Sequence, residues 1–139
     1  MAEKKRINNF QVIVIGIIFD PKERKILIGR REKDPILPQL SWCFMGGGLT
    51  DDGEMNRTLK EKIKEQTGLE VKNLGAIFAK TYEEKRDIVG IYFLCEAVGG
   101  TMKRGGKMKE LKWVKPSEIE KHFTTSFHPR LKEYLLHIG

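Results

Sequence analysis

The stretch GGGLTDDGEMNRTLKEKIKEQTGLEV, residues 46–71, joins three consecutive glycines to a pattern typical of an amphipathic helix. Three residues without side chains indicate a turn with unusual dihedral angles, a place where a ligand approaches the backbone, or both. Leu59 and Ile63 are four positions apart, so they predict a helix over residues 55–67 that buries one face. Gly68 is the expected C-cap of that helix.

Apolar and β-branched runs before and after this stretch predict strands. The first two are expected to form a hairpin, and the third, LSWCFM, is expected to stop at the glycines. The predicted strands cover residues 11–19, 25–31, 40–45, 69–84, 87–100 and 110–114, and further helices are expected at 116–123 and 129–137. This order, with one helix in the middle and two at the end, predicts an α/β protein with a mixed sheet.

Length and composition set the organisation of the chain. The 139 residues, about 40% of them apolar, suffice for one core but not for two ordinary domains, so a single domain over residues 1–139 is expected. No apolar run approaches the roughly 20 residues that cross a bilayer, and the start lacks the apolar stretch of a signal peptide. A cytoplasmic protein is therefore expected. Cys43 and Cys95 stand apart within apolar runs, which predicts buried thiols and argues against a zinc site or a disulfide.

The chain is basic, with 26 Lys and Arg against 19 Asp and Glu and a formal net charge of +7. This balance favours polyanionic partners such as nucleotides. A solvated lysine-rich surface explains the same charge, and no arginine-rich helix or aromatic RNA-binding pattern is present. A nucleic-acid partner is therefore only weakly supported.

The element order and the glycine turn that leads into a helix resemble the Nudix family. The family's box reads Gly, five residues, Glu, seven residues, then Arg-Glu-aliphatic-any-Glu-Glu-any-Gly-aliphatic. The segment from 47 to 69 matches that spacing without gaps, and the wider resemblance covers roughly residues 12–119. The matching box positions are Gly47, Ile63, Glu65, Gly68 and Leu69. The resemblance implies a Nudix fold, an α/β/α sandwich around a mixed sheet, and Mg²⁺- or Mn²⁺-dependent cleavage of a nucleoside diphosphate linked to another group.

Four box positions differ from the family's pattern. Gly53 replaces the first Glu, Glu61 and Lys62 replace the Arg-Glu pair, and Gln66 replaces the second acid of the Glu-Glu pair. The family's acids at the positions of 62, 65 and 66 would share one helix face beside the carbonyl of the residue at 46. Only Glu65 remains of those three acids, so a normal multi-metal site is not expected. A further family acid before the Trp strand also has no counterpart at residues 107–109.

Two interpretations of the remaining acids stay open. Glu61 and Glu65, at i and i+4, would form a two-carboxylate site, joined by Glu54, Asp51 or Asp52 from the turn. Alternatively, Glu61 pairs with Lys62 or Lys64 on a solvated helix face.

The candidate site residues follow from the resemblance and from residue chemistry. Arg30 could reach a phosphate or be a solvated strand end, and Trp42 could stack on a base or belong to the core. The predicted catalytic residues are Glu65 and Glu61; the predicted metal ligands are Glu65, Gly46, Glu61 and Gln66; the predicted nucleotide-binding residues are Gly46, Gly47, Gly48, Arg30 and Trp42.

The sequence is therefore compatible with two functions. The first is a Nudix-type pyrophosphohydrolase, slow because its box acids are replaced and dependent on Mg²⁺ or Mn²⁺ when active. The second is a nucleotide- or RNA-binding module of the same fold without hydrolysis. The sequence does not specify the base, the attached group or the oligomeric state.

Overall fold

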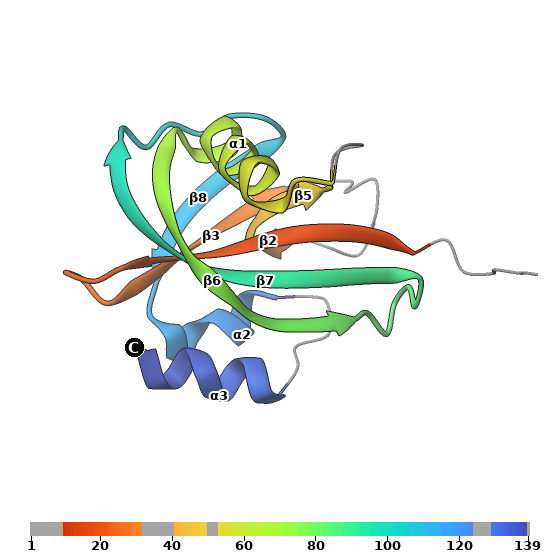
Figure 1. The fold of residues 1–139 in the computed structure, drawn as a ribbon. Coiled ribbons are helices and arrows are strands. Elements are labelled where there is room, and N and C mark those ends of the chain that lie inside the picture. The colour runs from red at the N-terminus through yellow and green to blue at the C-terminus, as the bar shows by residue number, and fades with distance from the viewer. Residues whose placement is uncertain (1–9, 32–40, 50–52, 124–128, 139) are drawn as a thin grey trace, which may run out of the picture.

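The fold is seen in a computed structural model that describes residues 10–31, 41–49, 53–123 and 129–138. A mixed sheet carries α1 on one face and α2 and α3 on the other (Figure 1). This arrangement confirms the expected α/β/α sandwich. The predicted acids Asp51 and Asp52 lie outside the described residues.

The sheet has seven strands in which one pair is parallel. The strands are β2 (Gln11–Asp20), β3 (Lys25–Arg31), β4 (Trp42–Cys43), β5 (Met45–Gly48), β6 (Leu69–Thr81), β7 (Ile88–Gly100) and β8 (Met108–Val114). The order is β4-β3-β2-β7-β6, with β5 added to β2 and β8 to β3. β2 and β7 run parallel, and the other pairs are antiparallel. The mixed sheet predicted from the sequence is therefore confirmed.

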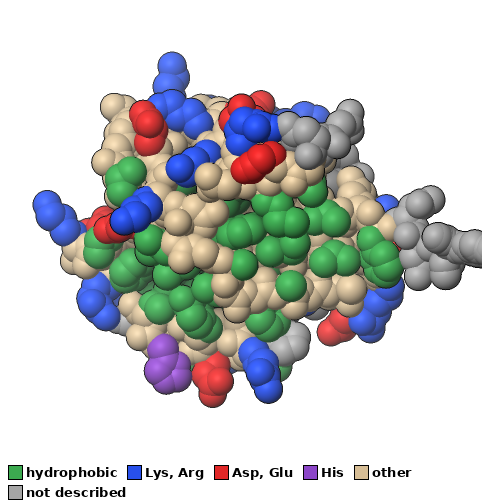
Figure 2. All heavy atoms as spheres, in the orientation of Figure 1, with side chains coloured by type: hydrophobic (Ala, Val, Ile, Leu, Met, Phe, Trp, Pro, Cys, Tyr) green, Lys and Arg blue, Asp and Glu red, His purple; other side chains and the backbone are tan. Residues whose placement is uncertain are grey.

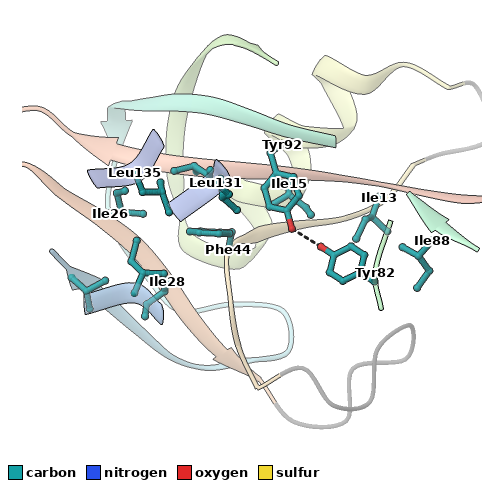
Figure 3. Close-up of a cluster of buried hydrophobic side chains, with 13 residues drawn as sticks. Ile13, Ile15, Ile26, Ile28, Phe44, Tyr82, Ile88, Tyr92, Leu131 and Leu135 are labelled. Atoms are coloured by element: carbon teal, nitrogen blue, oxygen red, sulfur yellow. Dashed lines mark hydrogen bonds between the residues drawn. The ribbon is translucent and has the colours of Figure 1, made fainter. Parts of the chain in front are cut away.

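The central strand β2 is apolar along its length because both of its faces are covered. Val14 and Ile18 pack with Leu59 and Ile63 of α1. The alternate residues face a second cluster beneath α2 and α3, part of which Figure 3 shows: Ile13, Ile15, Ile26, Ile28, Phe44, Tyr82, Tyr92, Leu131 and Leu135. A strand buried on both faces reads as a continuous apolar run, as this one does.

The glycines do not end a strand, as the sequence analysis expected, but form one. β5 pairs with β2 so that Gly46 lies opposite Ile15 and Gly48 opposite Ile13. Gly46 has φ of 147°, and a Cβ there would overlap the carbonyl oxygen of Val14. The backbones of β5 and β2 approach so closely at Gly46 that only glycine fits there. This explains why a strand of the sheet contains three consecutive glycines.

The helices begin and end close to where the sequence predicted. α1 (Met55–Thr67) starts after Glu54, whose carboxylate accepts a hydrogen bond from the backbone N–H of Arg57, and ends at Gly68 with φ of 76°. A short 3-10 turn, η1 (Pro116–Glu118), leads into α2 (Ile119–His122), and α3 (Pro129–Ile138) follows. The start at Pro116 suits proline because the first helical N–H groups have no partner within the helix.

Both cysteines are buried thiols, as expected. Burial raises the pKa of Cys95 to about 12, so this thiol stays protonated and unreactive. Among the described residues, no helix is both long enough and apolar enough to span a membrane.

Candidate active site

The side chain of Gln66 holds both backbone polar groups of Gly46. The Gly46 N–H donates to Oε1 of Gln66 at 3.0 Å, and Nε2 of Gln66 donates to the Gly46 carbonyl at 2.8 Å. The backbone groups fix which amide atom is which, because an N–H can only donate and a carbonyl can only accept. Gln66 is 7% exposed, so the pair is shielded from competing water. Such a pair stabilises the turn more than either bond alone at the surface would.

The register of β5 explains why Gly46 needs this partner. Leu49 donates its N–H to the carbonyl of Val12, so every second residue of β5 bonds to β2. In an antiparallel pair the intervening residues point their N–H and C=O groups away from the partner strand. Gly46 is one of these intervening residues, and the amide of Gln66 takes the place of a further strand on that side.

Lys62 lies against the same turn, one helical turn before Gln66. Its Cδ and Cε atoms would stand 3.4 Å from a Cβ on Gly47. The aliphatic stem of Lys62 therefore covers the glycine strand, and the side chain is half-buried. Positions 62 and 66 share the face of α1 that meets β5. The glycines of β5 therefore contact a lysine side chain and an amide side chain.

The two predicted catalytic carboxylates line a cavity at α1. Glu61 and Glu65 are both exposed and border a hollow of about 540 Å³ between α1 and the strands β6 and β7. The other lining residues are Lys60, Lys64, Leu69, Glu70, Val71 and Val98. Nζ of Lys64 lies 3.3 Å from the Glu70 carboxylate. Lys64 thus pairs with Glu70 of β6, whereas one interpretation of the sequence had paired it with Glu61.

The loop between β7 and β8, residues 101–107, closes over the C-terminal end of α1. The N–H of Lys103 donates to the carbonyl of Thr67 at 2.7 Å, and the N–H of Gly105 donates to the carbonyl of Gln66 at 3.0 Å. These bonds satisfy helix-end carbonyls that have no partner within the helix. This contact was not predicted from the sequence, although the pair Gly105-Gly106 is a signal for a close backbone approach.

Arg30 and Trp42 lie on the other side of the sheet from α1. They face each other across β3 and β4, and Trp42 packs against the cluster beneath α2 and α3. The Trp42 ring meets the His122 ring edge-on at 5.3 Å between centroids. Nε of Arg30 lies 3.4 Å from the Glu110 carboxylate. The structure therefore brings Glu61, Glu65, Gln66 and Gly46–Gly48 around α1 and separates Arg30 and Trp42 from them.

A closed metal cage does not fit the described residues. No three His, Cys, Asp or Glu side chains in the described part of the chain come together as metal ligands. The Gly46 carbonyl already accepts from Gln66, and the Glu54 carboxylate caps α1. Glu61 and Glu65 fit a looser arrangement, because Mg²⁺ is often held by one or two carboxylates together with substrate phosphates.

Comparison with known proteins agrees with this architecture. The NUDIX domain model matches residues 9–135. An ADP-ribose pyrophosphatase from Methanocaldococcus jannaschii is 31% identical over 115 residues, which cover 79% of this chain and 64% of that protein. The match therefore spans less than two thirds of the length of this relative.

Solved structures share the fold at low sequence identity. A NUDIX hydrolase from Nitrosomonas europaea superposes with a TM-score of 0.74 at 18% identity, over 95% of this chain and 73% of that one. A MutT protein from Methanosarcina mazei has a TM-score of 0.70 at 18% identity, over 96% of each chain. Since the family model covers most of the sequence, the protein belongs to the Nudix family.

Proposed function

We propose that this protein is a Nudix-type hydrolase that cleaves the diphosphate of a nucleoside diphosphate linked to another group. The observation that carries the proposal is the placement of Glu61 and Glu65 together in the cavity beside α1, on the helix that also contacts the glycine strand. Family membership supports the reaction class. The similarity to the ADP-ribose pyrophosphatase of Methanocaldococcus jannaschii makes ADP-ribose the first substrate to test.

Glu61 and Glu65 are the residues that would hold Mg²⁺ or Mn²⁺ in this proposal, with the substrate phosphates completing the ligand set. A bound divalent cation supplies positive charge that eases attack of water on a phosphorus surrounded by negative oxygens. Three carboxylates line this cavity, but that of Glu70 pairs with Lys64, and Lys60 adds a further positive charge beside Glu61 and Glu65. We therefore expect turnover well below the roughly 1–1000 per second of ordinary enzymes.

The chain's own part in binding falls to the glycine strand and the basic side chains around α1. Gly48 has no atom within 4 Å of the place where a Cβ would stand, so a phosphate can approach its backbone, whereas the stem of Lys62 covers Gly47. Figure 2 shows basic and acidic side chains interspersed over the part of the surface formed by α1. The four basic residues of α1, Arg57, Lys60, Lys62 and Lys64, outnumber its two acidic residues, so a polyanion would still be attracted there. The predicted roles of Arg30 and Trp42 are a separate proposal, because both residues lie across the sheet from α1.

A second candidate is a nucleotide-binding module without hydrolysis. The favouring observation is that Gln66 occupies the Gly46 carbonyl while the stem of Lys62 covers Gly47. The Lys62 ammonium can bind a phosphate group but not a divalent cation, and the side-chain oxygen of Gln66, which could otherwise ligate a cation, already accepts from the Gly46 N–H. This candidate predicts nucleotide affinity that is the same in EDTA and in Mg²⁺.

One experiment separates the two candidates. Hydrolysis of ADP-ribose is followed in Mg²⁺ and in EDTA for the wild type, Glu65→Gln and Glu61→Gln, and binding of the same ligand is measured by calorimetry. Glu133→Gln on α3, across the sheet, is the matched control. The hydrolase proposal expects Mg²⁺-dependent turnover that falls at least 100-fold in Glu65→Gln and stays unchanged in the control. Tight binding without turnover in any metal would favour the second candidate.

A further inference from the structure

We propose that the side-chain amide of Gln66 holds Gly46 of strand β5 in place, as a bound cation would otherwise do, so that the geometry of this strand is independent of metal. Nε2 of Gln66 places its N–H against the Gly46 carbonyl at 2.8 Å, and Oε1 accepts from the Gly46 N–H at 3.0 Å. This inference goes beyond the proposed hydrolase function, because it concerns which group holds the turn in place.

A carboxylate at position 66 could not make both of these hydrogen bonds. A glutamate has the same length as glutamine and could still accept from the Gly46 N–H, but its second oxygen would face the carbonyl oxygen across 2.8 Å. Two oxygen acceptors at that distance repel unless a proton or a cation lies between them. In this protein the amide hydrogen of Gln66 already lies there.

Gln66 connects three parts of the structure: β5, α1 and the loop 101–107. The carbonyl of Gln66 accepts a hydrogen bond from the N–H of Gly105. Gly106 lies beside the Gln66 side chain, because a Cβ on Gly106 would stand 3.7 Å from Cγ of Gln66. Gln66 therefore ties the glycine strand to α1 through its side chain and ties the loop 101–107 to α1 through its backbone. Lys62, four residues earlier, contributes a positive charge on the same face and would oppose a divalent cation.

Two consequences distinguish this arrangement from a metal-held turn. Under the proposed function, a cation bound by the wild type would be held at Glu61 and Glu65, which line the cavity beside α1, and would stay away from the Gly46 carbonyl. A chain with a carboxylate at 66 and no lysine at 62 becomes dependent on a divalent cation for the stability of the turn, because the repulsion then needs a bridging charge.

The first test uses the wild type and Mn²⁺ alone, with paramagnetic broadening of amide signals as the readout. We expect amides near Glu61 and Glu65 to broaden at Mn²⁺ concentrations that leave the Gly46 amide sharp. We also expect the Gly46 amide to exchange slowly with solvent in EDTA, since Gln66 protects it. Preferential broadening at Gly46, or fast exchange in EDTA that slows on adding Mg²⁺, would overturn the proposal.

The second test uses thermal unfolding of Lys62→Gln/Gln66→Glu in EDTA and in Mg²⁺. The Tm of this double variant should be lower than that of the wild type in EDTA and should rise by about 8 °C when Mg²⁺ exceeds its Kd roughly 100-fold. The wild type, Lys62→Gln and the control Gln11→Glu on the exposed end of β2 should show no such rise. A double variant as stable as the wild type in EDTA would contradict the proposal.

These readouts stay separate from activity. If the protein hydrolyses nothing, the hydrolase proposal fails while the Gly46 signals still report on Gln66. If the double variant does not fold, the Mn²⁺ measurement on the wild type decides alone. If the wild type binds no Mn²⁺, the hydrolase proposal loses its metal site, and the exchange rate of the Gly46 amide in EDTA decides the inference by itself.

Discussion

The stem of Lys62 lies along Gly47, with Cδ and Cε 3.4 Å from where a Cβ on that glycine would stand. This distance is ordinary van der Waals contact, so Gly47 has room for a methyl group, whereas Gly46 next to it has none. The two neighbouring glycines therefore differ in what they require. The backbone geometry requires glycine at position 46 but not at position 47, and a role of Gly47 in binding would require the Lys62 stem to move aside.

Alanine substitutions at these two glycines should separate structure from binding. Gly46→Ala should cost about 2–4 kcal/mol in the free energy of unfolding, because φ is 147° and a Cβ would overlap the Val14 carbonyl. Gly47→Ala should change stability by less than about 1 kcal/mol. If phosphate approaches the backbone here, Gly47→Ala should still weaken ADP-ribose binding, as measured by calorimetry. Unchanged affinity in this stable variant would remove Gly47 from the binding site.

The hydroxyls of Tyr82 and Tyr92 form a buried hydrogen bond of 2.7 Å beneath α3, drawn as the dashed line in Figure 3. Replacing either tyrosine by phenylalanine should cost about 1–3 kcal/mol, because the remaining hydroxyl loses its partner in the core. The double substitution should cost less than the sum of the two singles. Urea unfolding of the four proteins measures this coupling, and additive effects would show that the two hydroxyls act independently.

The same pair predicts how stability changes at alkaline pH. Burial raises the pKa of Tyr92 to about 12 and raises that of Tyr82 further, whereas an unfolded tyrosine ionises near about 10. The folded state keeps protons that the unfolded state loses, so this contribution is complete below pH about 10 and is lost as the pH rises toward 12 and beyond. The double phenylalanine variant should lose less stability than the wild type between pH 9 and 11. Equal losses of stability in the two proteins would show that Tyr82 and Tyr92 do not cause this pH dependence.

Basic residues of the loop 101–107 should attract a polyanionic ligand. Lys103 and Lys107 are exposed on the loop that closes over the end of α1. Lys103→Glu/Lys107→Glu should weaken ADP-ribose binding several-fold at low salt, and the difference should shrink as salt is added. The matched control is Lys115→Glu/Lys121→Glu near α2, which changes the net charge by the same amount. Equal weakening in both variants would indicate a general charge effect.

The ion pair between Arg30 and Glu110 allows a sharp test of the predicted phosphate contact on the other side of the sheet. Arg30→Met should lower affinity about tenfold or more if the guanidinium binds phosphate. Glu110→Gln, which removes the charge of this one carboxylate and keeps Arg30, should leave affinity equal or higher. Loss in both variants would mean that the pair orders the strands, and no loss in either would return Arg30 to a solvated strand end.

Much of the fold was predictable because local pattern decides it. Leu59 and Ile63 at helical spacing, with Gly68 after them, place α1 to within a residue, and the apolar run of β2 reveals a strand covered on both faces. The strand that was expected to stop at the glycines was the local error. Glycine has a low strand propensity, and only the close pairing with β2 compensates for it.

The sequence by itself determined the helix, the strands, the buried cysteines and the replacement of carboxylates by Lys62 and Gln66. Only the tertiary structure decided that Gln66 bonds to Gly46, 20 residues earlier, and that Trp42 packs on the far side of the sheet from Glu65. The physical reason is register. Periodicity shows which residues of an element are buried, but the register of β5 on β2 decides which backbone groups point outward and therefore which side chain must meet them.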